Sequence, residues 1–178
     1  MLDFLNARTE MRRKAGRIYG AIVTQARRSD FYAELRVPDT PSGRYEMVVL
    51  HLFLVLERLR ANPDAASPLP RLLVEAFIAD MDDSLRELGT GDLAVPKKVR
   101  RAATGLYERS MAYKGALGLG NGAALASAIA EHVYLTAESD RARMLAVYVR
   151  ATASSLAAAD MDELLDGKFG FPPVPVTQ

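Results

Sequence analysis

Four carboxylates lie within eight residues of one amphipathic segment, and their spacing suits metal binding or catalysis. At 100° per residue, Asp80, Asp83 and Glu87 share one helix face, whereas Asp82 stands four residues before Arg86 and can pair with it. A di-metal site in a helical bundle usually adds Glu-x-x-His motifs, and neither histidine of the chain belongs to one. The segment also lacks the glycine and the glutamate of a calcium-binding loop. We therefore favour a solvated or partner-facing acidic surface and expect no bound metal.

His51 and His132 are the only histidines, and both lie in segments predicted to be helical, where axial haem ligands can be placed. His51 lies among Val48, Leu52 and Val55. This apolar environment favours a core histidine that is hydrogen-bonded to a carboxylate or a carbonyl group. We expect His132 on the surface and no bound cofactor. A helical metal- or haem-binding carrier is the alternative function.

Arg44, His51 and Arg58 are spaced seven residues apart and therefore lie nearly in line between the two apolar faces of their predicted helix. Where this row meets the core it needs partners, because an unpaired buried charge costs several kcal/mol. The candidate acceptors are Asp39, Asp80 and Asp82. We predict that one of two pairs forms: Arg44 with Asp80, or Arg58 with Asp82. Either contact would lock the loop at residues 38–43 against the acidic helix.

Four basic residues fall within the first turns of a later predicted helix: Lys97, Lys98, Arg100 and Arg101. Cations in a first helical turn oppose the helix dipole by about 0.3–1 kcal/mol each. Their placement therefore has a small cost that a function would explain. A solvated face is the default interpretation. The functional interpretation is contact with an anionic membrane surface or with ribosomal RNA.

Composition limits the class of protein. The chain has 178 residues, 49% of them hydrophobic and 25% charged, which is typical of one globular domain. A formal net charge of +1 argues against specific DNA binding, and the absence of cysteine excludes disulfides, thiolate zinc sites and cysteine-ligated iron–sulfur clusters. No nucleophile motif or glycine-rich phosphate loop occurs, so we expect no enzymatic activity.

The N-terminal residues and the apolar stretches indicate where the protein acts. Charges from Asp3 to Lys14 interrupt any secretory signal, and no apolar stretch is long enough to span a membrane. We therefore expect a cytoplasmic protein, with peripheral contact at the inner membrane as an option that the basic cluster leaves open.

Helical periodicity runs through the chain and no strand pattern occurs, which predicts an all-α, single-domain bundle of about six helices. The predicted helices cover residues 3–28, 44–61, 69–88, 96–117, 123–137 and 140–159. A proline-containing loop at residues 37–43 follows the first helix and a short turn. We predict that Ser67, Asn121 and Asp160 cap the N-terminal ends of helices and that Gly89 ends a helix. We divide the chain into a helical domain, residues 1–167, and an extended, mobile, proline-rich tail, residues 168–178.

A series of short stretches forms a pattern in one order and register across roughly residues 15 to 150. The stretches are Phe31-Tyr32, Val37-Pro38-Asp39-Thr40, Gly43-Arg44-Tyr45-Glu46, Leu50-His51-Leu52, Arg58-Leu59, Asp80-Met81-Asp82, Leu85-Arg86-Glu87, Gly91-Asp92 with Val95, and Arg109 to Tyr113. Together they resemble the ubiquinol-cytochrome c chaperone family, the assembly factors of the cytochrome bc1 complex.

The resemblance implies an α-helical, non-enzymatic chaperone that handles newly made cytochrome b, and the short N-terminus is similar to that of bacterial members. Mitochondrial members of the family also work with a small helical partner at the ribosome exit. We expect the client to bind in an apolar groove beside the acidic helix. The expected partner-binding residues are Phe31, Tyr32 and Tyr45 in the groove, with Asp83 and Glu87 exposed beside it. A homo-oligomer is a further option.

Overall fold

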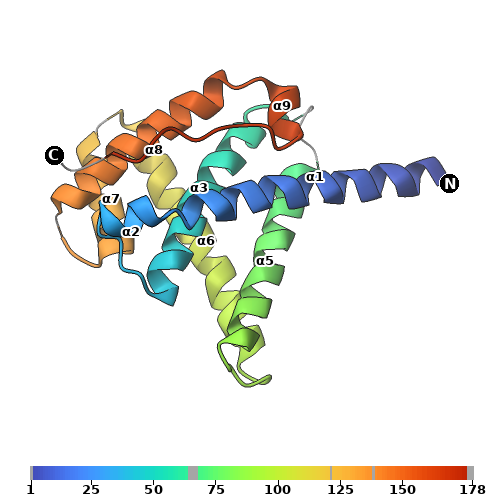
Figure 1. The fold of residues 1–178 in the computed structure, drawn as a ribbon, viewed down its shortest axis with the longest axis horizontal. Helices are drawn as coiled ribbons and strands as arrows, with labels where there is room; N and C mark the ends of the chain where they lie inside the picture. The colour runs from blue at the N-terminus through green and yellow to red at the C-terminus, as the bar shows by residue number, and fades with distance from the viewer. Residues whose placement is uncertain (1, 64–67, 121, 138, 176–178) are drawn as a thin grey trace.

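The computed structural model describes residues 2–63, 68–120, 122–137 and 139–175, and all regular structure in these ranges is helical. The elements are α1 (Leu2–Ala26), α2 (Ser29–Ala33), α3 (Pro41–Arg60), α5 (Leu69–Glu87), α6 (Val95–Gly118), α7 (Gly122–Ile129), the π-helical turn η1 (Ala130–Tyr134), α8 (Asp140–Ala158) and α9 (Met161–Leu165). The predicted all-α fold is confirmed, and each of the six predicted helices corresponds to one of the long elements, with α7 and η1 forming the fifth (Figure 1).

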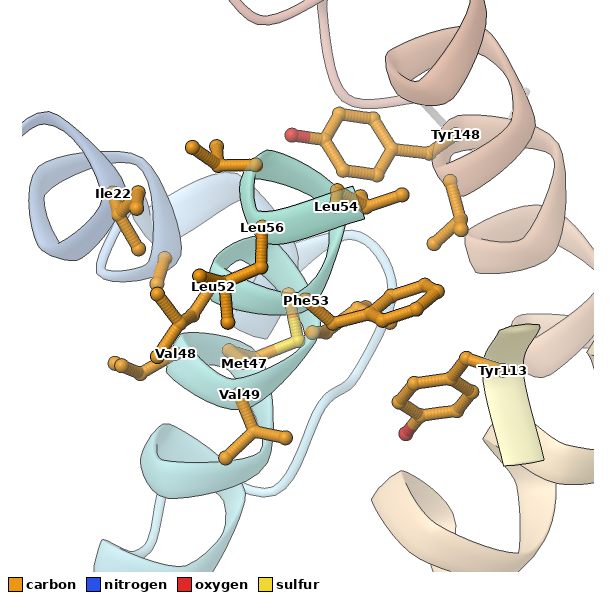
Figure 2. Close-up of a cluster of buried hydrophobic side chains, with 14 of the residues drawn as sticks. Ile22, Met47, Val48, Val49, Leu52, Phe53, Leu54, Leu56, Tyr113 and Tyr148 are labelled. Atoms are coloured by element: carbon orange, nitrogen blue, oxygen red, sulfur yellow. The ribbon is translucent and has the colours of Figure 1, made fainter. Parts of the chain in front are cut away.

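Helix α3 is the central element of the core. It contacts α1, α5, α6, α8 and η1, and nearly every residue from Glu46 to Leu56 is buried. In Figure 2 its Val48 and Leu52 lie on the side of Ile22, whereas Phe53 lies on the side of Tyr113, because neighbours surround the helix. This arrangement explains why its sequence is apolar on two faces, as predicted.

The loop before α3 fixes where that helix begins. Thr40 is the N-cap, and its hydroxyl accepts a hydrogen bond from the Gly43 amide at 3.1 Å. Pro41 follows at the first helical position, where its missing N–H leaves no donor unsatisfied. The helix therefore starts three residues earlier than predicted. Gly43 packs so closely against the Pro38 carbonyl that a Cβ atom would clash with it.

Other helix boundaries follow the predicted stop signals where they are described. Gly89 follows α5 with φ of +76°, and the Asp160 side chain accepts hydrogen bonds from the amides of Asp162 and Glu163 at the start of α9. Ser67 and Asn121, the other two predicted caps, lie outside the described residues. Pro68 takes the N-cap position of α5.

Helices α5 and α6 form a hairpin that projects from the rest of the bundle (Figure 1). The N-terminal part of α5 enters the core through Leu69, Leu73 and Phe77, which are buried. Helix α5 also packs on α1, and its C-terminal half lies beside α6 and the start of α3. The connecting turn leaves Leu93 wholly exposed, at 100% of its accessible surface.

The C-terminal tail packs on the bundle over residues 168–175. Residues 168–175 are extended, as expected, but the strap that they form runs along α8 (Figure 1) and packs against the core. Val174 is buried, and the ring of Phe171 lies 5.4 Å from the ring of His51. The prolines keep the chain extended, while burial of the apolar side chains between them favours this packing.

Candidate binding groove

A groove with a volume of about 1140 Å³ runs between α5 and α6 and ends against the start of α3. We call it the α5–α6 groove. Its α5 wall presents Met81, Leu85 and Leu88, which continue the apolar stripe of this helix beyond the buried Phe77. Leu88 is 64% exposed. One amphipathic face therefore serves two environments, the core at its N-terminal half and an open groove at its C-terminal half.

The α6 wall is cationic. Lys97, Lys98, Arg100 and Arg101 are all exposed and all line the groove. Lys98 donates to the Thr90 hydroxyl at 3.2 Å. Within the described part of the chain, the other three make no hydrogen bond or ion pair. The fold therefore places these charges side by side without neutralising them.

The floor of the groove holds a buried ion pair that connects α3 with α6. Glu46 is only 3% exposed, and Arg109 donates to its carboxylate from Nε and Nη2 at 2.8–3.0 Å. These hydrogen bonds raise the pKa of Arg109. A two-pronged pair of this kind satisfies both charges and fixes the relative position of the two helices.

Tyr45 completes the floor beside that pair. Its hydroxyl donates to the Ala102 carbonyl at 2.9 Å, and the Arg109 guanidinium lies 5.8 Å from the centre of its ring. Burial raises the pKa of Tyr45 to about 12, so the hydroxyl stays protonated. A Cβ atom on Gly105 would clash with this hydroxyl, so glycine at this position leaves room for the Tyr45 hydroxyl against α6. Tyr45 lies in the groove, as we expected.

The residues that sequence reasoning missed are Glu46 and Arg109. They are 63 positions apart, and no local pattern connects them. Both stand in stretches that carry the family resemblance, Gly43-Arg44-Tyr45-Glu46 and Arg109 to Tyr113. The family resemblance is therefore the feature of the sequence that could have identified Glu46 and Arg109.

The predicted contacts of Arg44 and Arg58 with the acidic helix are wrong. Arg44 donates to Asp39 at 2.7 Å, and Asp80 instead accepts a hydrogen bond from the Tyr19 hydroxyl at 2.8 Å. Arg58 donates to the carbonyls of Leu156 and Ala159 at the end of α8, at 2.6 and 3.0 Å. The start of α3 lies beside the C-terminal half of α5, so Arg58, near the other end of α3, is remote from Asp82.

The local acid–base pair in the acidic helix is confirmed. Arg86 donates to Asp82 at 2.6 Å and, across the turn, to Asp92 at 2.6 Å. Asp83 and Glu87 are exposed, as predicted, but only Glu87 lines the groove. Asp83 is therefore not brought together with the other expected partner-binding residues.

Phe31 and Tyr32 do not reach the groove, which corrects their predicted role there. Phe31 has no exposed surface and packs edge-on against His51 and Tyr148, with ring centres 5.4 and 5.0 Å away. Tyr32 is half-buried and donates to the Ala26 carbonyl at 2.9 Å. The helical turn α2 directs both rings toward the bundle, because the core is where their apolar surface is removed from water.

His51 is a core histidine bonded to a carbonyl, as predicted. It is wholly buried; Nδ1 donates to the Met47 carbonyl at 2.7 Å and Nε2 accepts from the Tyr148 hydroxyl at 2.9 Å. Tyr148 in turn accepts from Gln25 at 2.9 Å. Burial lowers the pKa of His51 to about 4, so the ring is neutral at ordinary pH, and in the tautomer with the proton on Nδ1 each of these hydrogen bonds has a donor and an acceptor. With both nitrogens bonded, His51 offers no free ligand to haem iron.

The described residues show neither a metal site nor a membrane-spanning helix. In the described ranges, no three His, Asp or Glu side chains gather in an arrangement that would hold a metal ion. The same ranges contain no helix with the length and apolar content that a membrane span requires.

His132, which we expected on the surface, is partly exposed. Its ring packs edge-on against the ring of Tyr113, with the ring centres 6.0 Å apart.

The fold and the groove define an all-α domain with a buried apolar core and an open groove that is partly apolar and partly cationic. The family model described as "Ubiquinol-cytochrome C chaperone" matches residues 33–171. The chain belongs to this family of chaperones for assembly of the cytochrome bc1 complex. It is also similar to a solved structure, the crystal structure of the Cbp3 homolog from Brucella abortus, with 35% sequence identity, a TM-score of 0.86 and 97% of each chain covered. A comparison with curated proteins finds no match.

Proposed function

We propose that this protein is a non-enzymatic assembly chaperone that binds newly made or unassembled cytochrome b in the α5–α6 groove. The observation that carries the proposal is the family match across residues 33–171, together with likeness to the Cbp3 homolog over 97% of the chain. The family acts on a membrane-protein complex, and a client of that kind exposes apolar surface before it is assembled. Met81 and Leu85 offer apolar surface for it to contact.

The floor of the groove favours a pre-formed site. Glu46 and Arg109 hold α3 and α6 together by a nearly buried ion pair, and Tyr45 is anchored to α6 through Ala102. A client segment would therefore meet a surface whose shape does not have to form on binding, which limits the entropic cost of association.

Peripheral contact with the inner membrane or the ribosome, from the cytoplasmic side, stays a prediction. The four cations Lys97, Lys98, Arg100 and Arg101 are exposed, as such contact requires. Their position on one wall of the groove favours a ligand within it over an outward-facing flat surface.

The test is capture of cytochrome b from a cell-free translation reaction by the tagged full chain. We expect cytochrome b to be retained by the unchanged protein and about tenfold less by Leu85→Glu, because the substitution places a charge where apolar contact is needed. Leu85 lies in the groove outside the buried core, so the variant should fold. The control is Val147→Glu, which places the same charge at an exposed apolar site on α8, outside the α5–α6 groove. Equal capture by both variants, or no capture by the unchanged protein, would refute the proposal.

A further inference from the structure

Part of the charge that lines the α5–α6 groove is paired within the protein, and most of the unpaired charge is positive. Glu46 is paired with Arg109, and Asp80 accepts from Tyr19. Arg44 is paired with Asp39. Among the described residues, the groove side chains without a hydrogen bond or ion pair are four cations and one carboxylate: Arg27, Lys97, Arg100, Arg101 and Glu87. The unmet charge therefore calls for an anionic occupant.

The two walls of the groove have different chemistry. Met81, Leu85 and Leu88 form an apolar row on α5 with the spacing of a helix face, opposite the cations of α6. A flat anionic surface could reach the cations but would leave this apolar wall in water. An occupant with an apolar side and an acidic side contacts both walls at once.

The size of the groove favours a polypeptide. Its volume of about 1140 Å³ exceeds the roughly 300–1,000 Å³ typical of small-molecule pockets, and it is partly open to solvent. An amphipathic helix that binds in such a groove buries its apolar face and leaves its polar face exposed to solvent.

We infer that the α5–α6 groove selects an acidic amphipathic segment, with apolar side chains against α5 and carboxylates against Lys97, Arg100 and Arg101. This inference rests on the proposed function in taking the groove as the client-binding surface, and it adds the chemistry of the segment that is recognised. The carboxylates would pair with the cations at the start of α6, which have no acidic partner among the described residues.

The experiment compares two fluorescent helical peptides of equal length and identical apolar positions, one with Glu and one with Lys at the flanking positions. We expect the acidic peptide to bind the unchanged protein at least about tenfold more tightly, because several partly exposed ion pairs act together. In the variant Lys97→Glu/Arg100→Glu/Arg101→Glu the preference should invert. Fluorescence anisotropy gives both dissociation constants, and circular dichroism checks that the variant is folded.

The matched control is Arg8→Glu/Arg12→Glu/Arg71→Glu, which changes the net charge equally at exposed positions outside the groove. The inference requires this variant to keep the preference for the acidic peptide. Equal affinity for both peptides, or an equal loss in the control, would overturn it. So would the absence of a peptide preference together with charge-dependent binding to phosphatidylglycerol vesicles or to RNA, which would assign the cations to a membrane or ribosome.

This outcome is separable from the capture of cytochrome b. If the client is retained and depends on Leu85, but neither peptide is preferred, the inference about charge fails and the proposed function stands. If the acidic peptide is preferred but cytochrome b is not captured, the proposed client is wrong and the groove chemistry stands.

Discussion

The polar groups around His51 are hydrogen-bonded to one another, whereas the cations at the start of α6, on the wall of the α5–α6 groove, have no acidic partner among the described residues. In the core, Gln25, Tyr148, His51 and the Met47 carbonyl form one continuous chain of hydrogen bonds in which each donor meets an acceptor. In the groove, neighbouring cations of α6 are left unneutralised and an apolar row of α5 is left open. The first region uses polar residues to specify the fold, whereas the second holds charges that the fold does not need.

The comparison separates residues that look alike in sequence. Phe31 and Leu93 are both large apolar residues next to a turn, yet one has no exposed surface and the other is entirely exposed. Substitution near His51 should therefore reduce stability. Substitution in or near the groove should leave stability almost unchanged and alter binding instead.

The largest expected effect is that of Phe31→Ala. Its ring packs against His51 and Tyr148 at the centre of the core, so truncation should lower the free energy of unfolding by about 3–5 kcal/mol. Leu93→Ala is the control and should change it by less than about 0.5 kcal/mol. Urea unfolding followed by circular dichroism measures both. Similar values for the two variants would abolish the distinction between the regions.

Acidification should weaken the core next most strongly. Since the pKa of His51 is lowered from 6.5 to about 4, the unfolded chain binds a proton in this interval that the folded chain does not. The contribution of neutral His51 to stability is complete above pH 6.5 and is lost as pH falls toward 4, amounting to about 3 kcal/mol in total. Below pH 4 this group adds no further loss.

The check is the urea midpoint between pH 7.5 and pH 5, in the unchanged protein and in His51→Leu. The variant should show the shallower pH dependence, because it lacks the titrating group. An NMR titration of the unchanged protein gives the same answer without a substitution, with His132→Gln used to assign the two imidazoles. Titration of His51 near pH 6.5 would contradict the described hydrogen-bond chain.

Local features of the sequence predicted what local chemistry decides. The Asp82–Arg86 pair follows from a four-residue spacing on a helix, and the termination of α5 follows from Gly89. The buried, carbonyl-bonded state of His51 follows from its apolar neighbours. The apolar residues on two faces of α3 follow from the neighbours that surround this helix.

The errors arise where a residue has several partners of suitable chemistry and only the three-dimensional arrangement chooses. Arg44 takes Asp39, five residues before it, and Arg58 takes backbone carbonyls of α8 about 100 positions away. The Glu46–Arg109 pair is invisible for the same reason. The proline-rich composition of the tail indicated an extended chain correctly but carried no information about the surface that buries Val174.

The smallest expected effect is an increase in the free energy of unfolding, whereas most substitutions lower it. Lys97 is the third residue of α6, where its charge opposes the helix dipole, and the first turn contains no acidic residue. Lys97→Gln should therefore raise the free energy of unfolding by about 0.3–1 kcal/mol, and Lys97→Glu by about twice as much. If the groove recognises carboxylates, the same substitution should weaken binding of the acidic peptide. Stability and affinity would then change in opposite directions at one residue, which distinguishes a charge kept for binding from one kept for folding. A fall in the urea midpoint of Lys97→Glu would instead place Lys97 among the residues on which the fold depends.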